Sequence, residues 1–402
     1  MKFLHLADAH LDSPFLGLSF LPSKAFDQIY QASDQSFEKL IDLAVNEQVD
    51  LVLIAGDTFD SSRPSPRSQL FFAQQIARLT EHQIQTVMIF GNHDHMRASD
   101  LLVKPSPYFK LLGDGEEIEK TSFTTKDGFA YDVVGFSYLN NHITEDLVSR
   151  FPEKTPGVYT FGLAHMQEAA SQNVYAPFTM SELQDLNYDY FALGHIHKRQ
   201  ILSQEPWVVY PGNIQGRHIK ETGPKGAYLG QVAPDGITTI DFVATSQIDW
   251  EAKELLLDHE LGKASLEEKI LSLLTADKPT YFSLTLRGAQ YLTAEEKQLL
   301  QDTDYWQALS RQLPPKCLLV DVRFEISQEI AINAADQAAF EQAQDEVLTA
   351  DYLTRLAQDW AKKDPAAADL LKDPAFIQTV FDQAKVQVMA KLKGIDDETE
   401  TD

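Results

Sequence analysis

Eight side chains in the first half of this 402-residue chain have the chemistry of metal ligands and of an acid–base group. They fall in five short motifs, each of which follows a short apolar run. Carboxylate, imidazole and amide groups together suit a pair of divalent transition metals, and such a pair, about 3.5–4 Å apart, promotes phosphoester hydrolysis. The eight residues are Asp8, His10, Asp57, Asn92, His93, His165, His195 and His197.

The spacing within the motifs indicates which residues act together. Asp8 and His10 are two positions apart, and His195 and His197 repeat that spacing. Because alternate residues of an extended chain face the same side, both members of each pair can point to one place. The members of each pair are therefore expected to face one side of their strand end.

The remaining motifs suggest distinct roles. A bridging carboxylate would fix the spacing of two ions, and Asp57 is our choice for it. Asn92 offers a neutral oxygen ligand, whereas the adjacent His93 diverges from it. We therefore expect His93 to act on the substrate as an imidazolium, by stabilising the transition state or protonating the leaving oxygen.

The elements that must position these residues are short apolar strands. Helical spacing over Lys24–Asn46 and Pro66–Glu81 alternates with the first strands, which predicts a parallel core with right-handed crossovers. The ligands then follow strand ends and are expected to meet on one rim of a sheet. The expected strands before the motifs are Phe3–Leu6, Leu51–Ile54, Val87–Phe90, Tyr159–Leu163 and Tyr190–Leu193.

Three domains are predicted along the chain. Residues 1–245 are interpreted as one two-layered α/β domain, and residues 250–330 as a small α/β appendage. Residues 335–402 have a helical composition, with apolar residues four apart. The elements expected in the appendage are Thr280–Leu286, Thr293–Leu300 and Lys316–Ile326.

Composition limits the possible functions. The formal net charge of −26 is unlike that of a protein that grips nucleic acid by itself, which should be basic. No apolar run approaches the roughly 20 residues of a membrane span. One cysteine, Cys317, fits a reducing compartment. We therefore expect a cytoplasmic protein with no membrane association, whose acidic excess either serves solubility or indicates a partner that supplies the DNA-binding surface.

The motifs resemble those of a known superfamily. As a set they look like the five signature motifs of the calcineurin-like metallophosphoesterases. Three longer strings resemble the SbcD-type DNA repair exonucleases, in particular the YhaO branch, and the likeness is strong over about residues 1–245. These strings are Asp8-Ala9-His10-Leu11-Asp12, Gly56-Asp57-Thr58-Phe59-Asp60 followed by Arg63-Pro64, and Tyr210-Pro211-Gly212-Asn213.

This resemblance implies a fold, a cofactor and partners. The fold would be a four-layer α/β/β/α sandwich, followed by a capping domain and a helical tail that binds the coiled-coil base of an SbcC-like ATPase. Related nucleases form homodimers through their first helices. The metal is usually manganese. One ion would be held by Asp8, His10, Asp57 and His197. The other would be held by Asp57, Asn92, His165 and His195, with His93 catalytic.

The leading hypothesis is therefore a metal-dependent DNA exonuclease or endonuclease subunit, which hydrolyses phosphodiester bonds in DNA repair. The alternative is a phosphodiesterase or phosphatase that acts on nucleotides or other small phosphoesters. Phosphoprotein phosphatases of the superfamily carry arginine where this chain has Ser61, which argues against them. A third hypothesis is a scaffold that keeps the metal site only for stability.

Four neighbouring residues have open interpretations. Asp60 and Asp94 either orient a ligand histidine or form turns. Arg217 and His218 follow the Pro211-Gly212-Asn213 string, and they either contact substrate phosphate or lie exposed.

Overall fold

The computed structural model describes residues 1–15, Leu18, Leu21, 23–169, 174–325, Gln342 and Arg355. The chain divides into two compact units. The first comprises Met1–Glu251, Ala276–Phe282 and Pro314–Val320, and the second comprises Ala252–Thr275, Ser283–Leu313 and the described residues from Asp321 onward. The predicted division into 1–245, 250–330 and 335–402 stays a prediction, and the helical tail lies almost wholly outside the described residues.

The first unit contains two six-stranded sheets. The first sheet has the order β14-β13-β1-β2-β3-β4, in which β1 to β4 run parallel and β13 and β14 are antiparallel additions. Its short central strands are apolar because both of their faces are covered. The strands are β1 Lys2–Leu6, β2 Leu51–Ala55, β3 Gln85–Ile89, β4 Phe109–Leu111, β13 Gly226–Val232 and β14 Thr238–Ala244.

The second sheet has the order β11-β12-β10-β7-β6-β5, with parallel strands from β12 to β6 and antiparallel edges. The two-layered interpretation of residues 1–245 was therefore too simple, since it combined two sheets into one. Its strands are β5 Glu119–Thr124, β6 Ala130–Gly135, β7 Tyr159–His165, β10 Tyr190–Gly194, β11 Gln200–Gln204 and β12 Trp207–Tyr210.

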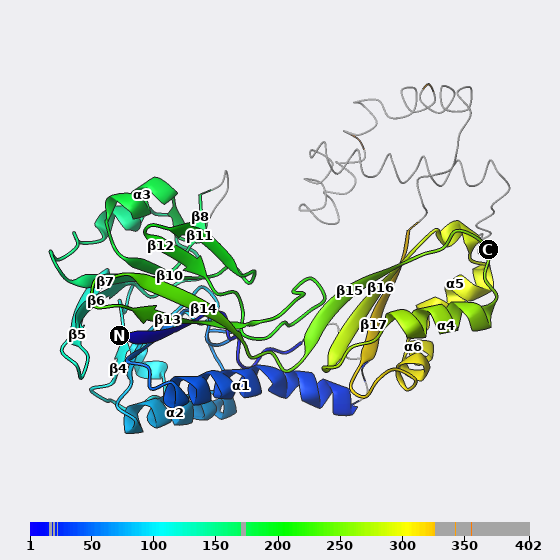
Figure 1. Cartoon of the computed structure of the whole chain (residues 1–402), viewed down its shortest axis with the longest axis horizontal. Helices are drawn as coiled ribbons and strands as arrows, with labels where there is room; N and C mark the ends of the chain where they lie inside the picture. Colours follow the sequence, from blue (N-terminus) through cyan, green and yellow to red (C-terminus); the bar gives the residue numbers. More distant parts are fainter. Residues whose placement is uncertain are drawn as a thin grey trace. The chain divides into compact units, whose positions relative to one another are not determined.

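Helices α1 (Ser23–Asn46) and α2 (Pro66–Glu81) lie side by side on one face of the first sheet (Figure 1). The sequence predicted α2 with these bounds because its start is marked locally: the Ser65 hydroxyl accepts the Ser68 N–H, and proline occupies the first helical position. Phe37 of α1 and Phe72 of α2 pack together at 5.7 Å between ring centroids. These rings and the side chains of β1 and β2 that face the helices form one hydrophobic core.

A second core lies between the two sheets. Phe3 of β1 contacts Phe161 of β7 and Tyr190 of β10 with ring centroids 5.1 and 4.9 Å apart. The opposite face of the second sheet is covered by η2 (Val148–Arg150), α3 (Met180–Asp185) and loops. The remaining short elements are η1 Ala98–Asp100 and the paired strands β8 Gln167–Glu168 and β9 Pro177–Phe178.

A third, three-stranded sheet has the order β15-β16-β17, and its strands are divided between the two units. The second unit adds the helices. Sequence reasoning found α5, whose start carries a capping box of Thr293 and Glu296, but it missed α4, which begins without a side-chain cap. The elements are β15 Asp249–Leu256, β16 Thr280–Arg287, β17 Leu318–Glu325, α4 Lys263–Leu273, η3 Ala289–Tyr291, α5 Ala294–Gln301 and α6 Thr303–Ser310. Among the described residues, no helix has both the length and the apolar character that a bilayer crossing requires.

The core between the sheets sets the stability of the first unit. Phe161 is fully buried there and contacts four aromatic rings. We expect Phe161→Ala to lower the free energy of unfolding by about 3–5 kcal/mol, because it leaves a cavity between two rigid sheets. Urea denaturation followed by circular dichroism measures this loss. The exposed Ile237 provides the control, since Ile237→Ala should change stability by less than about 0.5 kcal/mol. A loss below about 1 kcal/mol for Phe161→Ala would contradict the packing described.

Candidate metal centre

The predicted site residues all follow strand ends, but these strands belong to two sheets. Asp8 and His10 follow β1, Asp57 follows β2, and Asn92 and His93 follow β3 of the first sheet. The other three come from the second sheet, where β7 ends and just after β10 ends. They are His165, His195 and His197. The expectation of one rim on one sheet is therefore corrected: the carboxyl ends of two facing sheets meet at the site.

Tight turns aim several of these side chains inward. The backbone φ angles of Asp8, His10 and Asp57 are 51°, 43° and 49°, and that of His195 is 102°. Such left-handed conformations cost non-glycine residues about 1–3 kcal/mol and occur where surrounding contacts enforce them. Here the His10 N–H donates to the Asp57 carbonyl at 3.0 Å, which holds two of the turns together.

One group of donors is formed by Asp8, His10 and His197, whose ligand atoms lie within 4.8 Å of one another. The Nε2 atoms of His10 and His197 are 3.0 Å apart. Two ligands at right angles, each about 2.1 Å from one ion, would be about 3 Å apart. The two imidazoles are therefore spaced as adjacent ligands of a single metal ion.

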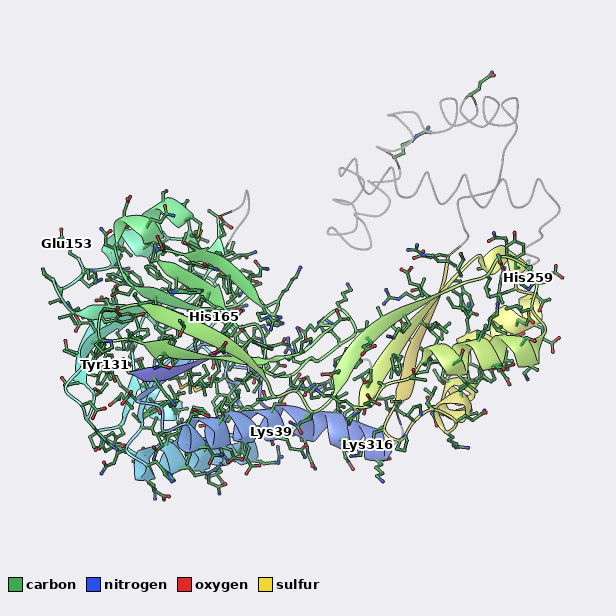
Figure 2. The ribbon with its side chains drawn as sticks, viewed as in Figure 1. Lys39, Tyr131, Glu153, His165, His259 and Lys316 are labelled. Carbon is green, nitrogen blue, oxygen red and sulfur yellow. The ribbon has the colours of Figure 1, made fainter. Side chains whose placement is uncertain are left out.

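A second group surrounds the side-chain oxygen of Asn92. His165 Nε2 lies 3.0 Å from this oxygen, and His195 Nδ1 lies 3.1 Å from it. The Nδ1 atom of His165 contacts the carbonyl of Ala55 at 2.9 Å, so this nitrogen carries the proton and Nε2 presents its lone pair. Figure 2 labels His165 among the strands of the first unit, where it is 0% exposed.

Asp57 lies between the two groups. Its Oδ2 atom is 3.7 Å from His10 Nε2 and 3.3 Å from His165 Nε2. Its Oδ1 atom accepts the His93 backbone N–H at 2.9 Å. One carboxylate oxygen thus faces a histidine from each donor group, which is the position that a bridging ligand requires.

The electrostatics of the site favour the metal-binding protonation state at Asp57, His10 and His195, but not at His165. Burial works to raise the pKa of Asp57, but His165 outweighs it and holds that pKa far below its usual value. Burial lowers the pKa of His10 to about 3, and burial with the charge of His165 lowers the pKa of His195 to about 3. Burial also opposes a charge on His165, yet Asp57 raises its pKa to about 9. A cation bound between Asp57 and His165 would replace this imidazole proton.

The histidines of the site differ in their exposure. His10 and His165 are fully buried, whereas His93, His195 and His197 are half-buried. The Nδ1 atom of His93 lies 3.1 Å from the Asp60 carbonyl, to which it can only donate. The Nε2 atom is therefore the one that His93 can direct at a substrate.

The open interpretations of Asp60 and Asp94 are now resolved. Asp60 Oδ1 lies 2.9 Å from His10 Nδ1, on the side of the ring away from His197, so it orients His10. Asp94 instead organises backbone: it accepts the N–H groups of Gly91 and Thr58, both at 2.7 Å. Both carboxylates are thus structural supports of the site.

Sequence reasoning missed Glu221. Its Oε1 atom lies 2.6 Å from His197 Nδ1, and its Oε2 atom accepts the amide of Asn213 at 2.8 Å. Asn213 belongs to the string Tyr210-Pro211-Gly212-Asn213, which the sequence analysis singled out. An acidic residue shortly after this string was the signal that could have indicated Glu221. Arg217 is not exposed: its side chain is 15% exposed and its guanidinium pairs with Asp60.

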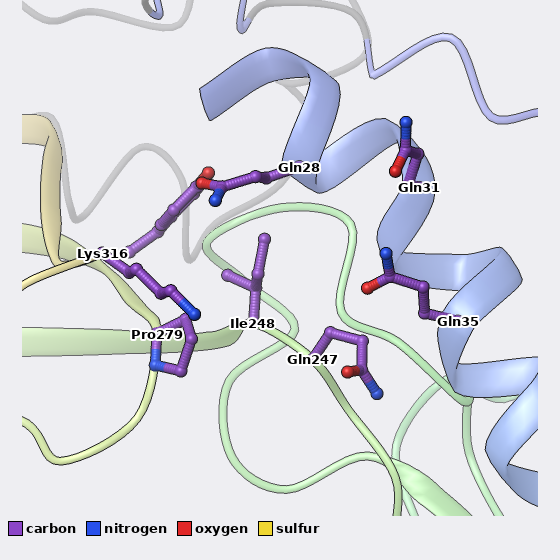
Figure 3. A pocket seen from close by; sticks show the side chains of 8 residues that line it. Gln28, Gln31, Gln35, Gln247, Ile248, Pro279 and Lys316 are labelled. Carbon is purple, nitrogen blue, oxygen red and sulfur yellow. The ribbon is translucent and has the colours of Figure 1, made fainter. Parts of the chain in front are cut away.

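A separate pocket in the first unit lacks such chemistry (Figure 3). Amide side chains supply much of its lining, and none of the eight predicted site residues takes part. The lining residues are Gln28, Gln31, Gln35, Gln247, Ile248, Pro279, Tyr281 and Lys316. The strand-end cluster therefore remains the candidate site.

The space around Asp57 requires glycine at position 91. A Cβ atom there would lie 2.2 Å from Asp57 Oδ1 and 2.7 Å from its backbone nitrogen. We expect Gly91→Ala to displace Asp57 and to lower the number of bound Mn²⁺ ions below that of the unmodified chain, as measured by elemental analysis after dialysis. Gly262→Ala, where an added Cβ meets nothing within 4 Å, is the control. Equal metal content in Gly91→Ala and the unmodified chain would contradict this role.

Comparisons with known proteins agree with this site. The profile of the calcineurin-like phosphoesterase family matches residues 1–199. The metallophosphoesterase YhaO of Bacillus subtilis is 36% identical over 321 residues, which are 78% of this chain and 78% of YhaO.

More distant relatives bear the name DNA double-strand break repair protein Mre11. The protein of Sulfolobus acidocaldarius is 26% identical over 204 residues, half of each chain. The protein of Methanocaldococcus jannaschii is 23% identical over 378 residues, 89% of this chain and 92% of that one. The mixed α/β sheets and the clustered metal donors agree with the match, and the chain belongs to the calcineurin-like metallophosphoesterases.

Proposed function

We propose that this chain is a two-metal phosphodiesterase that acts on DNA, as an exonuclease or endonuclease subunit in DNA repair. The position of Asp57 Oδ2 between His10 and His165 carries the proposal, because a shared carboxylate is what a two-metal site requires. The likeness to proteins named Mre11 favours DNA over nucleotides or other small phosphoesters as the substrate.

The donor atoms support an assignment of ligands. The outer nitrogens of His10 and His197 face Asp60 and Glu221, so both rings present Nε2 to the centre. We propose manganese for both ions. One ion would be bound by Asp8, His10, Asp57 and His197, and the other by Asp57, Asn92, His165 and His195.

The chemistry follows from these positions. Two bound ions would neutralise the phosphate oxygens and supply a water-derived nucleophile. Attack on phosphorus breaks the bond to the leaving oxygen, which needs a proton or a hydrogen bond as charge develops on it. His93 is half-buried, with Nδ1 held by the Asp60 carbonyl and Nε2 available to donate. The other seven residues would therefore hold the ions, and His93 would act on the substrate.

We also propose roles for the remaining parts of the protein. The fold would be a four-layer sandwich with the appendage as a capping domain. Residues 335–402 would bind an SbcC-like coiled-coil ATPase in the cytoplasm, and helix α1 is a candidate for homodimer contacts. The net charge of −26 supports a partner that supplies the positive surface for DNA.

The roles of His93 and Asp57 can be separated by two variants. We expect His93→Ala to bind two Mn²⁺ ions but to lose about 100-fold or more in DNA hydrolysis, because it removes the proton donor alone. Asp57→Asn should lose the paired site, since an amide cannot bridge two cations as a carboxylate does. Nuclease assays with Mn²⁺ and elemental analysis measure both properties.

Two outcomes would contradict these roles. Reduced metal binding in His93→Ala would make it a ligand, and equal nuclease activity in His93→Ala and the unmodified chain would indicate contamination. Turnover of p-nitrophenyl phosphate far above that of its bis-ester would instead favour the phosphatase alternative.

The proposed partner surface is tested by deleting residues 335–402. Hydrolysis of bis-p-nitrophenyl phosphate should be unchanged, because all the site residues lie before position 222. Binding to the SbcC-like ATPase in a pull-down should be lost. Binding retained by the truncated chain would refute the role of the tail.

A further inference from the structure

Arg217 lies close to two carboxylates, the half-buried Asp60 and the buried Glu221. Its guanidinium forms an ion pair with Asp60, and its Nε atom lies 4.0 Å from Glu221 Oε1. Its backbone N–H also donates to Glu221 Oε2 at 2.7 Å. The side chains of Arg217, Asp60 and Glu221 are only 15%, 17% and 6% exposed, so water screens their charges weakly.

Each of these carboxylates lies close to the outer nitrogen of a proposed metal ligand. Asp60 Oδ1 lies 2.9 Å from His10 Nδ1, and Glu221 Oε1 lies 2.6 Å from His197 Nδ1. The inner nitrogens of the two rings then meet at 3.0 Å. Arg217, the two carboxylates and the two imidazoles thus form a closed ring of contacts, in which the arginine is opposite the metal position.

The ring joins segments that are far apart in sequence. Asp60 follows β2, whereas Arg217 and Glu221 lie in the loop between β12 and β13, and Arg217 is 157 residues further along the chain than Asp60. Without the guanidinium, the two carboxylates would repel each other with little screening. The rings that they orient would then lose their fixed separation.

We propose that Arg217 is a positioning residue, which fixes the separation of His10 and His197 and so sets the affinity of the ion between them. This inference rests on the proposed two-ion site. The other ion should be affected much less, because its donors are held differently: His165 is fixed by the Ala55 carbonyl, and the His195 backbone N–H donates to Asp8 at 3.1 Å.

The test is a titration of Mn²⁺ into the metal-free full-length protein. We expect Arg217→Gln to bind one ion as the unmodified chain does and the other about 10–100-fold more weakly, the usual effect of removing an outer contact of a metal ligand. Electron paramagnetic resonance at two equivalents of Mn²⁺ should show isolated ions in the variant and coupled pairs in the unmodified chain.

Arg78 provides a matched control. It lies on α2 and also reaches two acidic side chains, Glu38 and Asp42 of α1, but it is not bound to any site residue in the contacts described. Arg78→Gln should leave both affinities unchanged. Arg217→Lys keeps the charge without the planar fork, so it should weaken one ion about 10-fold.

The outcomes separate this inference from the proposed function. Unchanged binding of both ions in Arg217→Gln, or equal weakening of both, would overturn the role of Arg217. If Arg217→Gln does not fold, as judged by circular dichroism, Arg217→Lys decides by the same criteria. An unmodified chain that binds fewer than two ions would reject the two-ion site itself.

Discussion

The architecture depends on holding several carboxylates and imidazoles within a few ångströms of one another in an almost dry place. Burying a charge without a partner is strongly unfavourable, and like charges repel more when water is excluded. Backbone N–H groups and imidazoles offset part of this cost at Asp57, and three backbone N–H groups do so at Asp94. Metal ions would offset the rest. The loop conformations therefore depend on pairing the buried charges as much as on apolar packing.

Two facing sheets satisfy this constraint better than one. A single rim spreads its ligands along a line, whereas two sheets supply donors from opposite sides of a central carboxylate. This requires close approach of backbones, and glycine makes it possible: a Cβ on Gly194 of β10 would lie 1.9 Å from the Ala55 carbonyl of β2. The glycine that precedes His195 is thus needed for the contact between sheets, and not only for the turn.

Sequence could predict what is encoded locally. The apolar runs, the helix that starts at Ser65 and Pro66, and the polar residues after each strand are all visible within a few positions. The contacts of Glu221 and Arg217 could not be predicted, because their partners are distant: Arg217 and Asp60 are 157 residues apart. A charged residue whose partner is distant in sequence looks like a solvated one. Arg217 was therefore expected to contact substrate phosphate or to lie exposed, whereas its guanidinium pairs with Asp60.

The position of His93 and the net charge of the chain both affect how this protein could bind and hydrolyse DNA. Five of the seven proposed ligands are buried, whereas His93, His195 and His197 are half-buried, so a phosphate must reach this partly open side of the cluster to react. DNA is a polyanion, and a chain with a net charge of −26 repels it over distances of about 8–10 Å at physiological salt. Two divalent ions reverse the charge only locally. For the proposed nuclease, hydrolysis and capture are therefore separate tasks: this chain would supply the reacting centre, and the proposed partner would supply a more basic surface that attracts the rest of the DNA.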